Sequence, residues 1–261
     1  MTKVIAITNQ KGGVGKTTTA VNLSACLAEA GQRVLLIDLD PQGNTSSGLN
    51  GRPGKNPSIY EVLVGKLPMR QALVNTKMKN LTLCPGDIRL AGAEVELVTM
   101  VKREFKLQSA IDQVAADYDF VLIDCPPSLG LLTLNGLCAA KTVLVPIQCE
   151  YFALEGVTAL VDTINRVKRT LNPQLDIEGI LMTMMDGRTN LSVQVVKEVK
   201  RHFKKKVFNT SIPRNVRLGE APSHGLPINL YDPRSTGCEA YRSLARELLT
   251  RNGKWRARDP T

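Results

Sequence analysis

A glycine-rich segment near the N-terminus contains the residue types that bind phosphate. It reads Lys11-Gly12-Gly13-Val14-Gly15-Lys16-Thr17-Thr18. Glycines let the backbone curl so that successive N–H groups face one anion, and a following Lys-Thr pair can reach phosphate oxygens and Mg²⁺. The segment departs from the usual pattern GxxxxGK[ST], because Gln10 stands where the first glycine is expected. We predict that residues 11–18 bind ATP, with Lys16 on the β- and γ-phosphates and Thr17 on Mg²⁺.

Three aspartates lie where apolar runs end, and they could complete the chemistry of phosphoryl transfer. Asp124 follows Phe-Val-Leu-Ile, the position from which a carboxylate can hold the water shell of Mg²⁺. Asp40 follows the second apolar run and is predicted to orient the attacking water. Asp38 lies in the same turn, and there a structural role competes with a chemical one. The three roles together describe ATP hydrolysis.

The order of apolar and helical segments places these residues at strand ends. Short β-branched runs predict strands at 4–7, 33–37, 120–123, 142–146 and 177–184. Helices are expected at 18–30, 93–116, 154–170, 191–203 and 238–251, with Gly31 as the residue after the first helix, and a long loop at 42–57. Apolar strands that alternate with helices predict a doubly wound α/β fold, with a mostly parallel sheet covered by helices on both faces.

We therefore expect one phosphate-loop (P-loop) NTPase domain over residues 1–251 and a basic, disordered tail at 252–261. A glycine-rich turn without a ligand is the alternative for residues 11–18. The strand before it, the helix after it and the Lys-Thr pair all argue against that alternative. The six cysteines contain no CxxC pair, which fits reduced thiols.

Positive charge is concentrated in two parts of the chain. The net charge is +10, residues 186–217 contain nine Lys or Arg against two acids, and residues 241–261 contain six against two. If residues 191–204 form a helix, Leu191, Val195, Val199 and Phe203 share one face. The opposite arc then carries Lys197, Lys200, Arg201 and Lys204. Such a stripe suits contacts with DNA phosphates without base reading, whereas a merely solvated helix face is the alternative.

Several further segments give the chain a family resemblance. They are DLDPQGN at 38–44, DCPPSLG at 124–130, QCEYFALEG at 148–156, IPRNVRLGEAPSHG at 212–225 and YDPRS at 231–235. With KGGVGKTT, these segments resemble the ParA/Soj chromosome-partitioning ATPases. That family belongs to the deviant Walker-A group of P-loop proteins, which also includes MinD and the nitrogenase iron protein. The resemblance covers essentially the whole chain.

The resemblance implies roles that the residues alone do not. Lys11 would reach across an ATP-dependent homodimer to the phosphates of the second copy, Pro213 and Asn215 would contact adenine, and Arg188 and Arg217 would bind non-specific double-stranded DNA. A ParB-like centromere-binding protein would stimulate hydrolysis and drive chromosome or plasmid segregation. The protein would be cytoplasmic and associated with the nucleoid. Operator binding is not expected, because the chain starts at the first strand.

Two alternatives within the same group make different demands on the chain. A MinD-like protein needs a C-terminal amphipathic helix that is free to enter lipid. Here Tyr241, Leu244, Ala245, Leu248 and Leu249 would form its apolar face, but we expect them to pack on the sheet, with no membrane partner. An electron-transfer ATPase needs cysteines that bridge an iron–sulfur cluster, and Cys125 is the one in the Asp124 loop.

Overall fold

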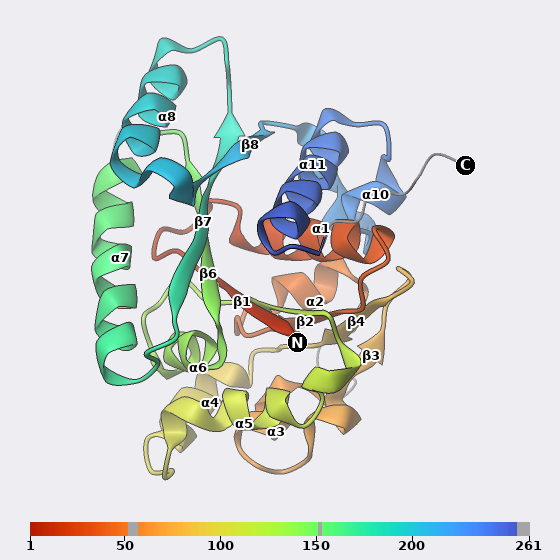
Figure 1. Ribbon diagram of the computed structural model, residues 1–261. Coiled ribbons are helices and arrows are strands. Elements are labelled where there is room, and N and C mark those ends of the chain that lie inside the picture. Colours follow the sequence, from red (N-terminus) through yellow and green to blue (C-terminus); the bar gives the residue numbers. More distant parts are fainter. Residues whose placement is uncertain (52–56, 151–152, 255–261) are drawn as a thin grey trace.

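Eight strands form one sheet, shown in Figure 1 in a computed structural model that describes residues 1–51, 57–150 and 153–254. The strands lie in the order β3-β4-β2-β5-β1-β6-β7-β8. Neighbours are parallel except β3 and β4, which pair antiparallel. The bounds are β1 Lys3–Ile7, β2 Val34–Asp38, β3 Val74–Asn75, β4 Leu81–Cys84, β5 Phe120–Asp124, β6 Thr142–Gln148, β7 Asp176–Met185 and β8 Val207–Pro213.

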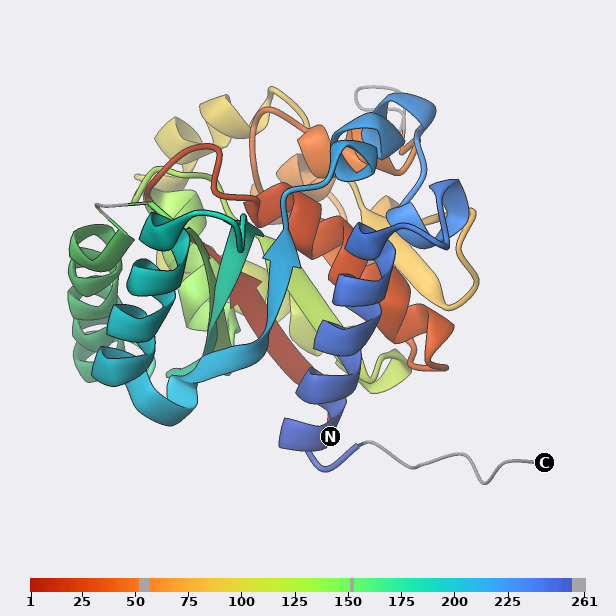
Figure 2. The same ribbon diagram turned by 90° about the horizontal axis from the view of Figure 1, so that it is seen from above.

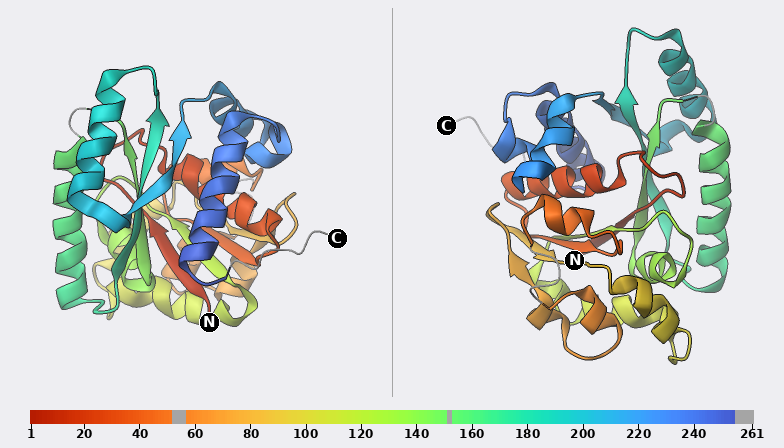
Figure 3. Two further views of the ribbon diagram at one scale, coloured as in Figure 1. Left: turned by 45° about the horizontal axis from the view of Figure 1, so that its top comes forward. Right: turned by 180° about the vertical axis from the view of Figure 1, so that it is seen from behind.

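Helices cover both faces of the sheet because its central strands are apolar on both sides. Along β1, Val4 and Ala6 belong to one buried cluster and Ile5 and Ile7 to the other. One face carries α1 Lys16–Glu29, α10 Ile228–Tyr231 and α11 Thr236–Arg251. The other carries α3 Ile59–Leu63, α4 Leu90–Leu97, α5 Lys106–Asp112, α6 Leu131–Ala139, α7 Ala153–Thr170 and α8 Asn190–Phe203. Figure 3 shows α7 and α8 side by side at one edge.

Short helical segments complete the chain between these elements. The remaining α-helices are α2 Asn44–Gly48 and α9 Val216–Glu220. Single 3₁₀ turns occupy Met69–Ala72, Arg103–Phe105, Ala115–Asp117, Lys204–Lys206 and Ala221–His224. The predicted doubly wound α/β class is confirmed, and α1, α7, α8 and α11 lie within two residues of their expected positions. Gly31 follows α1 with a φ of 86°, as predicted for a glycine after a helix.

Three expectations about local structure were wrong or incomplete. The single helix predicted at 93–116 is divided into α4 and α5, and between them Lys102 adopts the left-handed region with a φ of 53°. The loop predicted at 42–57 contains α2, and residues 52–56 lie outside the described part. Strands β3, β4 and β8 and helix α6 were not predicted. Helix α6 is apolar on most sides, and β8 has three consecutive polar residues, Asn209 to Ser211, in place of an alternating pattern, so neither has a strong periodic signal.

The apolar face of α11 is packed inside the protein. All five residues of the predicted amphipathic face are buried, and α11 contacts β8 and α1. Beyond α11, Asn252 donates to Glu178 Oε1 at 2.7 Å and Lys254 Nζ donates to the carbonyl of Asp119 at 2.8 Å. The rest of the predicted tail, 255–261, lies outside the described residues. No helix in the described part of the chain has the length and apolar character needed to cross a bilayer.

Candidate nucleotide site and basic surface

The glycine-rich loop joins β1 to α1 at the edge where the parallel strands end, visible at the top of Figure 2. Gly13 and Gly15 have φ values of 75° and 86°, a region that side-chain-bearing residues rarely adopt. Gly15 is also the N-cap of α1 and has no side chain to bond the first helical N–H groups. Those groups, together with the helix dipole, form a site for an anion.

Thr183 of β7 forms a hydrogen bond to this loop. Its hydroxyl lies 2.9 Å from the carbonyl oxygen of Val14 and 3.0 Å from that of Ile147, and it can donate to either. Thr183 is 2% exposed. Sequence reasoning missed this residue, because no local pattern links a threonine in a late strand to a loop near the N-terminus. The loop is therefore fixed to β7, the second strand from one edge of the sheet.

Lys16 lies across the mouth of the loop. Its Nζ donates to the carbonyl of Lys11 at 3.0 Å, and the residue is 7% exposed. Burial lowers the pKa of the Lys16 ammonium, and the charges of Asp124 and Asp40 partly oppose that shift. A buried cation whose hydrogen bond among the described residues is to a carbonyl is poised to exchange that carbonyl for a phosphate oxygen.

Asp124 is the carboxylate that fits a hydrated magnesium ion. Its Oδ2 accepts from Thr17 Oγ1 at 2.8 Å and from Thr45 Oγ1 at 2.7 Å, whereas the buried Oδ1 has no partner among the described residues. Burial raises the pKa of Asp124 to about 6. Mg²⁺ usually keeps several of its waters and takes few protein ligands. An orphaned carboxylate oxygen beside a threonine hydroxyl matches that coordination, so the predicted Thr17 and Asp124 lie together.

Asp38 has a structural position. Its Oδ2 accepts from Ser46 N at 2.8 Å and from Ser46 Oγ at 2.6 Å, and its Oδ1 accepts from Asp40 N at 3.3 Å. Burial and the neighbouring Asp124 raise the pKa of Asp38 to about 7. Ser46 lies in α2, so Asp38 fixes the predicted loop against β2. The structural alternative left open for Asp38 thus has direct support.

Asp40 lies at the same strand end with its side chain at the margin of the site. It is 9% exposed, and its Oδ1 accepts from Gln42 N at 2.9 Å. It is also one of the acids whose charge acts on Lys16. The structure therefore brings Asp40, Lys16, Thr17 and Asp124 to one place, as the sequence predicted.

We expect the buried carboxylates to make the stability of the nucleotide-free protein fall as pH rises. In the folded protein Asp38 and Asp124 keep protons that the unfolded chain has already lost. The free energy of unfolding therefore falls as pH rises from about 4 to about 7. Asp124→Asn removes one of these charges. The melting temperature of the variant minus that of wild type should therefore be more positive at high pH than at low pH. A shift of about two pKa units corresponds to about 3 kcal/mol at most.

Thermal unfolding without nucleotide or Mg²⁺, at pH of about 5 and about 8, tests this expectation. The surface variant Asp112→Asn is the control, because Asp112 is exposed on α5 and should give the same difference at both pH values. An Asp124→Asn difference that does not change with pH would show that Asp124 is ionised in both states.

Lys11 points away from the phosphate loop of its own chain. Its Nζ forms an ion pair with Glu150, just after β6, and its side chain is 50% exposed. The Lys11 backbone N–H donates to Asn9 Oδ1 at 3.0 Å, which fixes the start of the loop. Glu150 was not among the predicted site residues, since only the fold brings it near Lys11. The lysine is thus accessible from outside the protein.

Pro213 and Asn215 lie at the end of β8, one strand beyond β7. Pro213 pairs with Met185 of β7, and Asn215 is the N-cap of α9. Asn215 Nδ2 donates to Thr236 Oγ1 at 2.8 Å, whereas its buried Oδ1 has no partner among the described residues. A free amide oxygen of this kind could accept a hydrogen bond from an exocyclic amine.

The basic arc predicted on α8 is exposed. Val195 and Val199 are buried beneath it and Phe203 is half-buried, whereas the side chain of Leu191 is not among those described. Arg201 pairs with Glu198. Within the described part of the chain no acid pairs with the other members of the arc, Lys197, Lys200 and Lys204. Sequence spacing therefore identified a surface with uncompensated positive charge.

The two arginines implied by the resemblance have acidic partners on their own chain. Arg188 pairs with Asp186 at 2.7 Å while its side chain is 90% exposed. Arg217 pairs with Glu220 at 2.8 Å and with Asp232 at 3.4 Å. Exposed pairs of this kind are weak, so a phosphate could displace the carboxylates. The acids nevertheless reduce the charge available at these positions compared with the lysines of α8.

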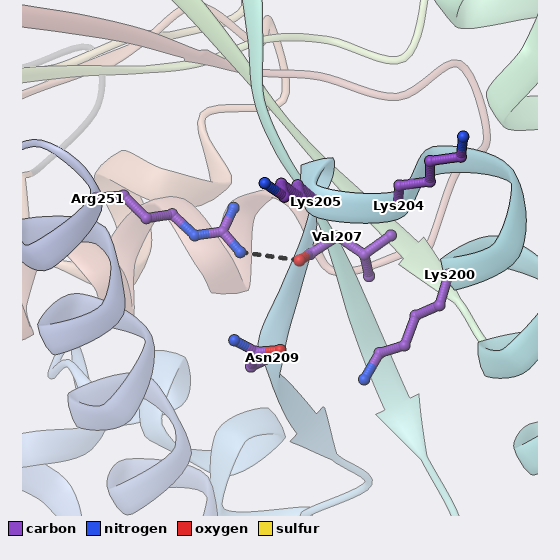
Figure 4. A pocket seen from close by; sticks show the side chains of 6 residues that line it. All are labelled: Lys200, Lys204, Lys205, Val207, Asn209 and Arg251. Carbon is purple, nitrogen blue, oxygen red and sulfur yellow. Dashed lines mark hydrogen bonds between the residues drawn. The ribbon is translucent and has the colours of Figure 1, made fainter.

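An open hollow next to α8 adds residues that the sequence did not indicate (Figure 4). Its lining comprises Lys200, Lys204, Lys205, Val207, Asn209 and Arg251. Arg251 comes from α11 and donates to the carbonyl of Val207 at 2.8 Å. Because α11 lies far from α8 in sequence, only the folded chain shows that Arg251 extends this basic surface.

The cysteines are separated from solvent. All six are free and buried, and burial raises the pKa of the Cys125 thiol far above its usual range. No group of three or more His, Cys, Asp or Glu suited to a metal ion occurs in residues 1–51, 57–150 and 153–254.

Comparisons with known proteins agree with this geometry. A family model described as an AAA domain matches residues 2–177. The sporulation initiation inhibitor protein Soj of Bacillus subtilis is 55% identical over 249 residues, covering 95% of this chain and 98% of that protein. The chromosome partitioning protein ParA of Myxococcus xanthus is 55% identical over 251 residues, covering 96% and 89%.

Solved structures show the same fold with nucleotide bound. A Mycobacterium smegmatis protein, named cobyrinic acid a,c-diamide synthase and holding ADP and magnesium, has a TM-score of 0.86 and 43% identity, and the match covers 97% of this chain and 96% of that one. The septum site-determining protein MinD of Pyrococcus horikoshii with Mg-ADP has a TM-score of 0.81 and 27% identity, covering 97% and 98%.

Proposed function

Since the chain belongs to the ParA/Soj family of chromosome-partitioning ATPases, we propose that Mg·ATP joins two copies into a dimer that binds duplex DNA without reading its sequence. Hydrolysis separates the copies and releases the DNA. The cargo moved by this cycle is a chromosome or a plasmid. The observation that carries the proposal is that one chain has both an exposed lysine on its phosphate loop and an exposed basic arc, in which Lys197, Lys200 and Lys204 have no acidic partner among the described residues.

Residues 11–18 bind the triphosphate. Gly12 to Gly15 and Thr18 supply backbone N–H groups, Lys16 neutralises the β- and γ-phosphates, and Thr17 ligates Mg²⁺, with Asp124 bonded to the water shell of the ion. Mg²⁺, when bound, would supply positive charge that stabilises the negative charge developing on the leaving ADP. Asp40 orients the attacking water. Pro213 and Asn215 contact the adenine, with the free Asn215 Oδ1 accepting from its amino group.

Lys11 completes the site of the second copy. In the single chain its ammonium is paired with Glu150 and half exposed. In the dimer it exchanges this carboxylate for phosphate oxygens bound to the other copy, as an arginine finger supplied in trans does. The geometry of the single chain supports this role because the lysine already projects outward.

DNA binds along α8 through Lys197, Lys200, Arg201 and Lys204, and Arg188 and Arg217 add phosphate contacts once their acids are displaced. Dimerisation doubles the number of contacts on one duplex, so the joined pair binds far more tightly than a single chain. A ParB-like centromere-binding protein stimulates hydrolysis. We place the protein in the cytoplasm, on the nucleoid.

One structural relative is named for a different reaction, the synthesis of cobyrinic acid diamide. The chain is 43% identical to that protein and 55% identical to the partitioning proteins, at almost equal coverage. Partitioning is therefore the function that the similarities favour.

The proposal is tested by DNA binding with ATP, with ADP and without nucleotide. We expect tight binding only with ATP and a steep loss of affinity with salt, because cations leave the DNA when lysines bind its phosphates. In Lys200→Ala/Lys204→Ala, the slope of log affinity against log salt should fall by about 2 per chain and affinity by about tenfold or more.

Lys77→Ala/Lys79→Ala removes two exposed lysines from the turn between β3 and β4 and is the matched control. It should leave both slope and affinity unchanged. Equal binding of nucleotide-free and ATP-bound protein would contradict the proposal, as would salt-insensitive binding.

A further inference from the structure

Helix α2 contacts two buried carboxylates of the site through neighbouring residues. Thr45 Oγ1 donates to Asp124 Oδ2 at 2.7 Å, and Ser46 Oγ donates to Asp38 Oδ2 at 2.6 Å. Both hydroxyl-bearing residues are fully buried. The two bonds are alike in burial and in the kind of partner, but only Asp124 has an oxygen left for a hydrated metal ion. Comparing them separates what a buried hydroxyl does for the fold from what it does for the metal.

Several contacts fix α2 against the end of β2. The Ser46 backbone N–H also donates to Asp38 at 2.8 Å, and the Gly86 N–H donates to Ser46 Oγ at 2.8 Å. A Cβ on Gly86 would lie 2.3 Å from the carbonyl oxygen of Asp38, so that segment packs closely against the strand end. Helix α2 also contacts α1, which follows the phosphate loop (Figure 1). Thr45 is therefore placed by its own helix, and its hydroxyl can fix the carboxylate rather than follow it.

The bonds of Asp124 give its two oxygens different roles. Oδ2 accepts from Thr17 and Thr45, whereas the buried Oδ1 has no partner among the described residues. A carboxylate held by one hydroxyl can still turn about its Cβ–Cγ bond, because that torsion of aspartate is broad. A second donor to the same oxygen, from a different helix, opposes this rotation. Thr45 thus keeps Oδ2 occupied and Oδ1 available.

Thr17 and Thr45 differ in what they can do for a metal ion. Thr17 follows Lys16, and its hydroxyl oxygen can bind Mg²⁺ while its hydrogen is still donated to Asp124. Thr45 lies outside the phosphate loop, 79 residues before Asp124 in the chain. Its hydroxyl is already bonded to the carboxylate, so it can act on the ion through Asp124. Residues that orient the partners of a metal in this way often change metal affinity by about tenfold or more.

We propose that Thr45 is a positioning residue for magnesium: its hydroxyl fixes the Asp124 carboxylate so that Oδ1 stays free for the water shell of the ion. The inference rests on the proposed role of Asp124 and adds a residue outside the phosphate loop to the metal site. Ser46 makes the corresponding bond to Asp38 and serves the fold. The Thr45 hydroxyl should therefore matter for nucleotide binding with Mg²⁺ and not for nucleotide binding without it.

The test measures the affinity of the full chain for a fluorescent ADP derivative, once with Mg²⁺ and once with EDTA. We call the ratio of the two affinities the magnesium effect. ADP is used because the proposed dimer requires ATP, so dimerisation and DNA binding do not enter the measurement. The melting temperature without nucleotide is measured on the same proteins to follow the fold separately.

Thr45→Val keeps the shape of the side chain and removes its hydroxyl. The magnesium effect should fall by about tenfold, whereas the affinity in EDTA should be unchanged. Thr45→Ala, a second change that removes the hydroxyl, should give the same loss, and Thr45→Ser, which keeps it, should match wild type. Ser46→Ala is the matched control from the same helix. It should lower the melting temperature, because the Gly86 N–H loses its buried acceptor, and leave the magnesium effect unchanged.

A double variant tests whether Thr45 acts through Asp124. Two residues that act as one unit do not have independent effects. Asp124→Asn should lower the magnesium effect by about tenfold or more, and Thr45→Val added to it should lower the effect no further. A full additional loss in the double variant would show that Thr45 acts by another route, which contradicts the inference.

Two further results would overturn the inference while the metal site stands. A magnesium effect of wild-type size in Thr45→Val, with the effect reduced in Asp124→Asn, would show that Asp124 needs no second donor. An equal loss of ADP affinity with Mg²⁺ and with EDTA would show that Thr45 serves the fold alone. If instead Asp124→Asn matches wild type, or wild type binds ADP equally well with and without Mg²⁺, the proposed metal site fails and the inference fails with it.

Discussion

Asp40→Ala should still form the ATP-dependent dimer while its ATP hydrolysis falls by about a hundredfold or more. Asp40 follows β2 at the margin of the site, and the bonds that fix the phosphate loop come from Thr183, Asn9 and Asp124 instead. Removing the Asp40 carboxylate therefore leaves phosphate and magnesium binding in place and removes the group that orients water. Turnover and light scattering with ATP measure the two effects separately.

Asp112→Ala, an exposed aspartate on α5, is the control for this variant and should behave like wild type. A monomeric Asp40→Ala protein at saturating ATP would mean that Asp40 takes part in the dimer contact. Unchanged turnover would mean that another group orients the water.

Lys16→Ala should lose nucleotide affinity by about a hundredfold, which corresponds to about 3 kcal/mol, and should not dimerise with ATP. The reason is that Lys16 is the buried cation at the mouth of the loop, and its charge is opposed only in part by Asp124 and Asp40. Because burial of this ammonium lowers its pKa, its removal should not destabilise the nucleotide-free protein.

Nucleotide binding by calorimetry and melting temperature without nucleotide measure these two outcomes. Lys79→Ala removes an exposed lysine from the turn after β3 and should match wild type in both. A Lys16→Ala protein that binds ATP normally would show that the backbone N–H groups and Mg²⁺ suffice. A large drop in its melting temperature would show that Lys16 acts mainly through the fold.

The sequence predicted the parts of the site that depend on local pattern. The apolar runs before Asp40 and Asp124 predict strands, because buried parallel strands are apolar throughout. The glycines before Lys16 predict the phosphate loop, because that loop needs left-handed residues. The fold class follows from the same alternation of strands and helices.

The parts that were missed depend on contacts between distant segments. Thr183 under the loop, Thr45 beside Asp124 and Glu150 beside Lys11 are ordinary polar residues until the sheet brings them together. Helix α6 was missed because its sequence, buried on most sides, has no amphipathic period. The break between α4 and α5 was missed because Lys102, which turns the chain there, is not a residue that usually marks a turn.

The strand β7 connects the phosphate loop to the basic surface. Thr183 in this strand bonds the phosphate loop, and three residues later Asp186 starts the turn that carries Arg188 and leads into α8. The same strand thus leads from the phosphate loop to the turn that begins the basic surface, with Met184 in the left-handed region between Thr183 and Asp186. Thermodynamic linkage is reciprocal. If ATP raises the affinity for a duplex as proposed, the duplex must raise the affinity for ATP by the same factor, so a DNA-bound chain is occupied by ATP at lower ATP concentrations than a free one.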